Sequence, residues 1–271
     1  MQFQAGTVWV GGGAPLFLIA GPCVIEGEAV LRRIAGQLAQ IARDVPIPLI
    51  FKASFDKANR SAGDSYRGPG LAAGLEMLHG IKHEFGLPLL SDVHTPDQCG
   101  PAAQVLDILQ VPAFLCRQTD LIQEAARTGK PINVKKGQFL APWDVKNILD
   151  KAAAVGNDHV MITERGASFG YNNLVVDFRG LPLMRSLGCP VIFDATHSVQ
   201  RPGAQGSCSG GDRDMVAPLL RAAVAVGCDG IFIEVHEHPD QALSDGPNMV
   251  KLDDLYALLT AVKRIDAAAR E

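Results

Sequence analysis

The chain has 271 residues, of which 47% are hydrophobic and 20% charged, and its formal net charge is −4. This composition is too apolar for a disordered chain, and the small negative charge argues against a nucleic-acid partner or a membrane surface. A chain of this length can form two domains or one large α/β barrel.

The first segment alternates polar and apolar residues. Phe3, Ala5, Val8 and Val10 are separated by polar or small residues, and three glycines follow at 11–13. Alternation with a period of two, bounded by glycines, is typical of a β-hairpin. We therefore expect a short hairpin within residues 1–14 that closes the N-terminal end of the main fold.

Eight short apolar runs follow, and amphipathic stretches lie between them. Continuous apolar runs are typical of strands that are buried on both faces of a parallel sheet. The runs are Leu16–Ala20, Pro48–Phe51, Pro88–Leu90, Ile108–Val111, Pro131–Val134, His159–Ile162, Pro190–Phe193 and Gly230–Ile233. The amphipathic stretches include Ala29–Ala42, Gly70–Phe85, Leu121–Thr128, Val145–Ala154, Asp214–Val226 and Leu252–Ala269. Eight strand-then-helix units without a linker predict one (β/α)8 (TIM) barrel domain over residues 1–271.

The sequence also bears on the compartment. No apolar run reaches the roughly 20 residues that span a bilayer, and no basic segment precedes the run at 16–20, as a signal peptide requires. The cysteines are scattered and form no C-x-x-C pair: Cys23, Cys99, Cys116, Cys189, Cys208 and Cys228. This usage is typical of a reducing compartment, so we expect a cytoplasmic protein in which most cysteines are small buried side chains.

Cationic residues follow several of the predicted strands. Chemistry in this fold lies at the carboxyl ends of the strands, where the barrel brings distant segments together. The cations there are Lys52, Lys57, Arg60, Lys135 and Arg165. Such a group predicts a site for small anionic substrates, most naturally phosphates and carboxylates.

A second group at the strand ends has the chemistry of metal ligands. Cys23, His197, Glu234 and Asp245 offer one thiolate, one imidazole and two carboxylates, which suit a divalent transition metal with a position left for water or substrate. The spacing contains no short-range motif, so a structural cysteine and a core histidine remain an alternative.

Several long segments resemble one enzyme family. They are Phe51–Ser61, Arg117–Leu121, Asn133–Phe139, Glu164–Gly166, Asp194–Gln200, Glu234–His236 and Ser244–Asn248. Together they closely resemble the 3-deoxy-D-manno-octulosonate 8-phosphate synthases, and the resemblance covers nearly the whole chain. It implies condensation of phosphoenolpyruvate with D-arabinose 5-phosphate, with release of phosphate, for lipopolysaccharide biosynthesis.

The resemblance also implies roles for individual residues. Lys135 and Arg165 are expected to hold the phosphate of phosphoenolpyruvate, while Lys52 and Lys57 contact the same substrate. The sugar phosphate is assigned to Asn59, Arg60 and Ser61, and Arg117 is expected to reach a neighbouring subunit's site in a homotetramer. The residues expected to take part in catalysis are His197, Asp245, Lys57 and Asp92.

Two features of the resemblance point to a particular branch. The related DAHP synthases, which use erythrose 4-phosphate, typically carry Lys-Pro-Arg-Thr where this chain has Lys57–Ser61. The metal-independent branch carries Asn at the position of Cys23. The cysteine therefore implies one divalent transition metal ion (Zn, Mn, Fe, Co or Cd) on Cys23, His197, Glu234 and Asp245.

Three alternatives stay open at this stage. A DAHP or sialic-acid-type synthase would use another aldose acceptor. A Schiff-base aldolase would form an imine on Lys52 or Lys135. A phosphosugar-binding barrel without catalytic activity would share the fold, because fold alone does not fix function.

Overall fold

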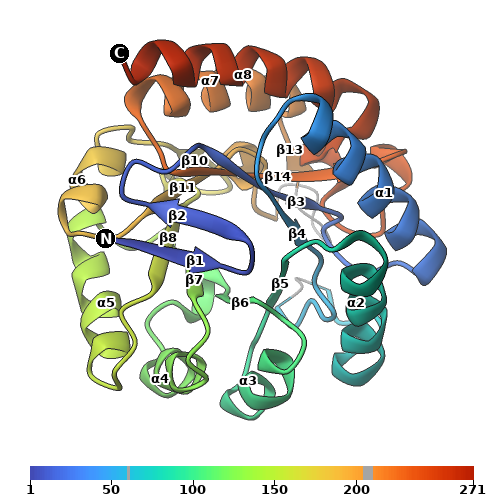
Figure 1. Cartoon of the computed structure of the whole chain (residues 1–271), viewed down its shortest axis with the longest axis horizontal. Coiled ribbons are helices and arrows are strands. Elements are labelled where there is room, and N and C mark those ends of the chain that lie inside the picture. The colour runs from blue at the N-terminus through green and yellow to red at the C-terminus, as the bar shows by residue number, and fades with distance from the viewer. Residues whose placement is uncertain (60–61, 204–209) are drawn as a thin grey trace.

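The computed structural model describes residues 1–59, 62–203 and 210–271, and its centre is a closed barrel of eight parallel strands (Figure 1). Neighbouring strands along the chain pair in order, and β11 pairs with β14 to close the barrel. The strands are β3 (Phe17–Gly21), β4 (Leu49–Lys52), β5 (Leu89–Asp92), β6 (Ile108–Val111), β7 (Ile132–Lys135), β8 (Val160–Glu164), β11 (Val191–Asp194) and β14 (Gly230–His236). The predicted (β/α)8 barrel is thus confirmed.

Helices surround the barrel, as Figure 1 shows. They are α1 (Glu28–Asp44), α2 (Leu71–Phe85), α3 (Pro96–Ala103), α4 (Thr119–Arg127), α5 (Lys146–Ala153), α6 (Gly180–Ser186), α7 (Val216–Val226) and α8 (Leu255–Ala269). In α1, Leu31, Ile34, Ala35 and Leu38 form the apolar stripe that packs on the strands. Each of the six predicted amphipathic stretches largely coincides with a helix. The other two, α3 and α6, have eight and seven residues and include a proline, so their sequences show little helical periodicity.

The predicted N-terminal hairpin is also present. Strand β1 (Gln2–Ala5) pairs antiparallel with β2 (Val8–Gly11), and the hairpin lies across the barrel in Figure 1. Its buried side chains, including Phe3 and Val10, share one hydrophobic cluster with Phe17 and Ile50 from the barrel interior. The hairpin therefore closes the N-terminal end of the barrel.

The barrel interior changes from apolar to polar along several of the strands. Side chains two residues apart lie on the same face of a strand. Phe232 belongs to the interior apolar cluster, and Glu234 lies two residues further toward the carboxyl end of β14. Ile192 and Asp194 repeat this order on β11. Polar side chains therefore form a layer that lies closer to the carboxyl ends of the strands than the apolar interior side chains do.

Short strands extend the loops near this layer. They are β9 (Ala167–Ser168) with β10 (Leu174–Val175), β12 (Gln200–Arg201) with β13 (Gly210–Gly211), and β15 (Val250–Lys251), which pairs with β14. Among the described residues, no helix has both the length and the apolar character to cross a membrane.

Candidate active site

A pocket lies at the carboxyl ends of the barrel strands. It brings together most of the residues singled out from the sequence, which come from six of the eight barrel strands or from the loops that follow them. These residues are Lys52, Lys57, Asn59, Asp92, Lys135, Arg165, His197, Glu234 and Asp245. The loops after the strands thus converge as the sequence predicted.

The lysine at the end of β4 is an interior residue. Lys52 is only 1% exposed, and its Nζ donates hydrogen bonds to Glu234 Oε1 at 2.6 Å and to the Cys23 carbonyl oxygen at 2.9 Å. Gly21 on the adjacent strand β3 is needed for this packing, because a Cβ there would lie 1.9 Å from the Lys52 carbonyl oxygen. The close approach of β3 and β4 therefore fixes the lysine in the wall of the pocket.

Two further cations lie on neighbouring strands. Lys135, at the end of β7, donates to Asp194, and its Nζ lies 3.3 Å from the centroid of the Phe232 ring. Arg165, just after β8, donates to Gln200 Oε1 at 2.7 Å. Burial lowers the pKa of both groups. Each cation would therefore be stabilised by an anion that enters the pocket.

Asp92 is held as a carboxylate. Ser54 Oγ and Gln110 Nε2 donate to its two oxygens, and Lys57 Nζ lies 3.8 Å from Oδ2. Burial alone would raise the pKa of Asp92, but the nearby Lys57 and Lys52 lower it by more, to well below its usual range. The side chain is thus suited to accept hydrogen bonds and not to donate a proton.

The imidazole of His197 is oriented by Asp194. The Asp194 carboxylate accepts hydrogen bonds from the His197 backbone N–H and from Nδ1, both at 2.8 Å. Nε2 then faces Glu234 Oε2 and Asp245 Oδ2, at 3.7 Å from each. A carboxylate that fixes the far nitrogen is the usual arrangement behind a metal-binding histidine.

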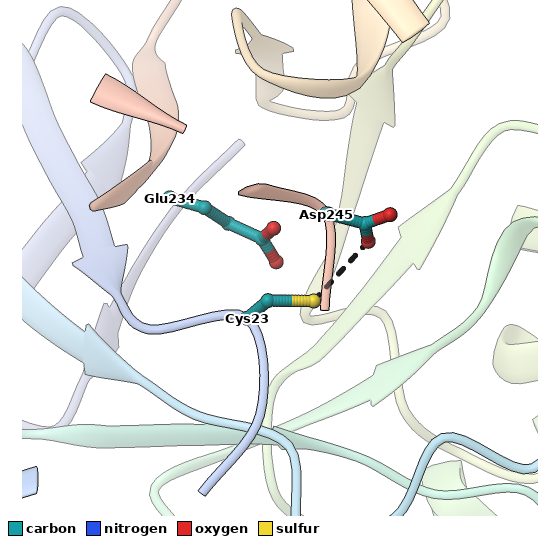
Figure 2. A group of neighbouring side chains, drawn as sticks. All are labelled: Cys23, Glu234 and Asp245. Atoms are coloured by element: carbon teal, nitrogen blue, oxygen red, sulfur yellow. Dashed lines mark hydrogen bonds between the residues drawn. The ribbon is translucent and has the colours of Figure 1, made fainter. Parts of the chain in front are cut away.

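Three of the expected metal ligands lie around one point (Figure 2). The ligand atoms of Cys23, Glu234 and Asp245 all lie within 4.8 Å of one another, and the Cys23 thiol donates to Asp245 Oδ2 at 3.2 Å. Glu234 Oε2 is buried and has no hydrogen-bond partner among the described residues. Burial and the Glu234 carboxylate raise the pKa of Cys23, so a thiolate there needs a nearby cation. The donor set therefore fits a divalent transition metal.

The expected group of cationic residues at the strand ends needs a correction. The sequence showed three lysines and two arginines at the strand ends, but the structure places a carboxylate beside each of the three lysines. The pairs are Lys52 with Glu234, Lys57 with Asp92, and Lys135 with Asp194. The pocket is thus lined by buried ion pairs and not by a uniform positive charge, because an ammonium group cannot be buried cheaply without a counter-charge.

The remaining predicted residues lie elsewhere. Arg117 is exposed outside the pocket lining, and its carbonyl oxygen accepts a hydrogen bond from Lys151. Arg60, Ser61 and Cys208 are outside the described residues. The cysteines predicted to be structural within the described part, Cys99, Cys116, Cys189 and Cys228, are buried and free.

Sequence reasoning assigned no role to several pocket residues. His94, Gln110 and Phe232 line the pocket, and Asp194 lies directly behind it. A signal was available for two of them: Gln110 and Asp194 each lie two residues after an interior isoleucine, so the strand period places them on the inner face.

Fold and site together define a (β/α)8-barrel enzyme that acts on small anionic molecules. The chain belongs to the DAHP synthetase I family, whose model matches residues 1–271. It is 62% identical over 269 residues to the 2-dehydro-3-deoxyphosphooctonate aldolase of Geobacter metallireducens, covering 99% of each chain. It is 60% identical to the proteins of that name from Geobacter sp. (strain M21), over 100% of this chain and 99% of the relative, and from Desulfatibacillum aliphaticivorans, over 96% and 95%.

Proposed function

We propose that this protein is an aldolase-type synthase. It condenses phosphoenolpyruvate with D-arabinose 5-phosphate and water, giving 3-deoxy-D-manno-octulosonate 8-phosphate and phosphate. The observation that carries this assignment is the full-length similarity of about 60% identity to several 2-dehydro-3-deoxyphosphooctonate aldolases. The pocket agrees with it, because lysines and an arginine from separate strands converge there.

Separate cationic groups position the two substrates. Lys135 and Arg165 hold the phosphate of phosphoenolpyruvate, and Lys52 and Lys57 contact its carboxylate. Asn59, with Arg60 and Ser61 beside it in the sequence, holds the phosphate of the sugar. Two anions repel each other in solution. Fixing both in one pocket lowers the activation free energy, by about 7 kcal/mol or more when the reacting atoms are well aligned.

The reaction forms one carbon–carbon bond and breaks one carbon–oxygen bond. C3 of phosphoenolpyruvate attacks the aldehyde carbon, water adds at C2, and the resulting phosphohemiketal loses phosphate. Burial would lower the pKa of Lys57, but the facing carboxylates of Glu234 and Asp92 raise it, so Lys57 stays protonated and donates a hydrogen bond to the developing alkoxide. Asp92 accepts hydrogen bonds from the sugar hydroxyls.

A metal ion completes this proposal. Cys23, His197, Glu234 and Asp245 hold one divalent transition metal, which supplies Lewis-acid chemistry to water or to the aldehyde oxygen. Two features support the assignment: Glu234 Oε2 has no hydrogen-bond partner within the described part of the chain, and His197 Nε2 faces it. Zn, Mn, Fe, Co and Cd all suit such a mixed ligand set.

We also propose a homotetramer in which Arg117 reaches the sugar-phosphate site of a neighbouring subunit. Large aromatic side chains are exposed in the loops that follow the adjacent strands β6, β7 and β8. They are Phe114, Phe139, Trp143, Phe169 and Tyr171. Exposed aromatic groups of this kind are typical of protein–protein contacts. The free, buried cysteines of the described part support a cytoplasmic location.

The test is an assay of phosphate release from the purified protein. We expect release with phosphoenolpyruvate and D-arabinose 5-phosphate, and much less with erythrose 4-phosphate or N-acetylmannosamine as acceptor. Preference for either of the other acceptors would favour a DAHP or sialic-acid-type synthase. Inactivation by borohydride in the presence of substrate would instead indicate a Schiff base, and full activity after complete metal removal would contradict the metal assignment.

A further inference from the structure

Four polar side chains form a continuous hydrogen-bonded file inside the barrel, across β8, β7, β6 and β5. Thr163 Oγ1 donates to Asn133 Oδ1 at 2.7 Å, and Asn133 Nδ2 donates to Gln110 Oε1 at 2.8 Å. Gln110 Nε2 then donates to Asp92 Oδ1. All four side chains are buried, and of the four only Gln110 and Asp92 line the pocket.

The Asp92 carboxylate fixes the direction of this file, and the Thr163 hydroxyl, which can donate or accept, satisfies its other end. The oxygen and nitrogen ends of an amide have nearly the same shape, so hydrogen-bond partners decide which way each amide points. A carboxylate only accepts, so Asp92 requires the nitrogen of Gln110. The oxygen of Gln110 then requires the nitrogen of Asn133, and the oxygen of Asn133 requires a donor, which the Thr163 hydroxyl supplies.

The direction matters for an anionic substrate. Gln110 Nε2 carries two hydrogens, and the bond to Asp92 uses one of them. If the amide were reversed, its carbonyl oxygen would face the Asp92 carboxylate and would offer the pocket an acceptor where a negative substrate needs a donor. The same reversal would release Asp92 from its fixed position near Lys57.

We propose that Thr163 and Asn133 are positioning residues that act through Gln110. They hold the Gln110 amide with its nitrogen toward Asp92 and its second N–H available to the bound substrate. The inference rests on the proposed function, because it assumes a negatively charged substrate beside Gln110. Neither residue needs to touch the substrate for this role.

The test removes the hydroxyl that begins the file. Thr163→Val changes shape little, and we expect it to lower kcat/KM for phosphate release about tenfold, the usual scale for one buried hydrogen bond to a site group. Thr163→Ser, which keeps the hydroxyl, should restore kcat/KM to within about twofold of the wild type. In a Gln110→Met background the file is already cut, so Thr163→Val should change kcat/KM by less than about twofold.

A matched control lies just after α4. Thr128 Oγ1 donates to the Ala125 carbonyl oxygen at 2.6 Å, and Thr128 does not line the pocket, so Thr128→Val should leave kcat/KM unchanged. Thermal denaturation checks that each variant is folded, and Thr163→Ala replaces the valine variant if that one does not fold.

Two results would overturn the inference. One is a Thr163→Val variant that keeps the wild-type kcat/KM, and the other is an equal fall of kcat/KM in the wild-type and Gln110→Met backgrounds. Failure of the proposed function is distinguishable, since the wild-type protein itself would then release no phosphate from the two substrates.

Discussion

Asp194 holds two site residues at once, so its replacement is the most informative single change. Its carboxylate is 0% exposed and accepts hydrogen bonds from Lys135 Nζ and from two nitrogens of His197. Asp194→Asn keeps the shape but leaves the Lys135 ammonium buried beside a neutral amide. Removing one partner of a buried ion pair costs roughly 3–5 kcal/mol, so we expect the free energy of unfolding at neutral pH to fall by about 3 kcal/mol.

The effect should depend on pH in a defined direction. Burial alone would raise the pKa of Asp194, but His197 and Lys135 lower it more, to below its usual range. A carboxyl group with a lowered folded pKa stabilises the protein above its unfolded pKa of about 3.9, and this contribution is lost as the pH falls further. The stability difference between the wild type and Asp194→Asn should therefore be full near neutral pH and shrink below about pH 4.

Urea denaturation followed by circular dichroism at several pH values measures this difference. Asp158→Asn is the control, because the Asp158 side chain is 68% exposed, and its effect should stay within about 0.5 kcal/mol. The reasoning is refuted if Asp194→Asn loses less than about 1 kcal/mol, or if the loss stays constant as the pH falls through the acid range.

Three other substitutions test separate parts of the structure. Cys23→Asn should abolish stoichiometric metal binding, measured by elemental analysis, while circular dichroism stays unchanged; retained metal would contradict the proposed ligand set. Gly21→Ala places a Cβ 1.9 Å from the Lys52 carbonyl oxygen, so we expect the free energy of unfolding to fall by at least about 2 kcal/mol. Thermal denaturation measures this loss, and a wild-type melting temperature would contradict the close approach of β3 and β4. Phe169→Asp changes a side chain that is 72% exposed, and it should weaken the proposed tetramer in sedimentation velocity without unfolding the subunit. Unchanged sedimentation of the variant would exclude Phe169 from the proposed interface.

The barrel could be predicted because its signals are local. A strand buried on both faces reads as a continuous apolar run, and each of the eight runs became a barrel strand. The hairpin showed its period of two, and its inner residues pack as that period requires. The helices α3 and α6 carry weaker signals, since seven or eight residues make only about two turns.

The site could be predicted only in part. Strand ends identify which residues reach the pocket, as for Lys135 and Glu234. They do not show which side chain faces which across the barrel, because that depends on strand tilt and on the loops. The pairing of Lys135 with Asp194, and the file that joins Thr163 to Asp92, link residues 59 and 71 positions apart in the sequence.

Glu234 links the proposed metal site to the substrate site. Its Oε1 accepts the Lys52 hydrogen bond at 2.6 Å, while Oε2 lies 3.7 Å from His197 Nε2, and the carboxylate belongs to the cluster with Cys23 and Asp245. A divalent metal ion on Oε2 would weaken the attraction between the Glu234 carboxylate and the Lys52 ammonium. The ammonium would then be freer to bind the substrate carboxylate. Metal and phosphoenolpyruvate should therefore bind cooperatively.

Such coupling is reciprocal, so each ligand must tighten the other by the same factor, which is about fivefold or more for typical coupled sites. Isothermal titration of phosphoenolpyruvate into metal-loaded and chelator-treated protein measures one side, and metal titration with and without phosphoenolpyruvate measures the other. Lys52→Met should abolish the coupling, because it removes the ammonium that Glu234 shares between the two sites. Equal affinities for phosphoenolpyruvate in the loaded and stripped protein would show that Glu234 does not connect the sites.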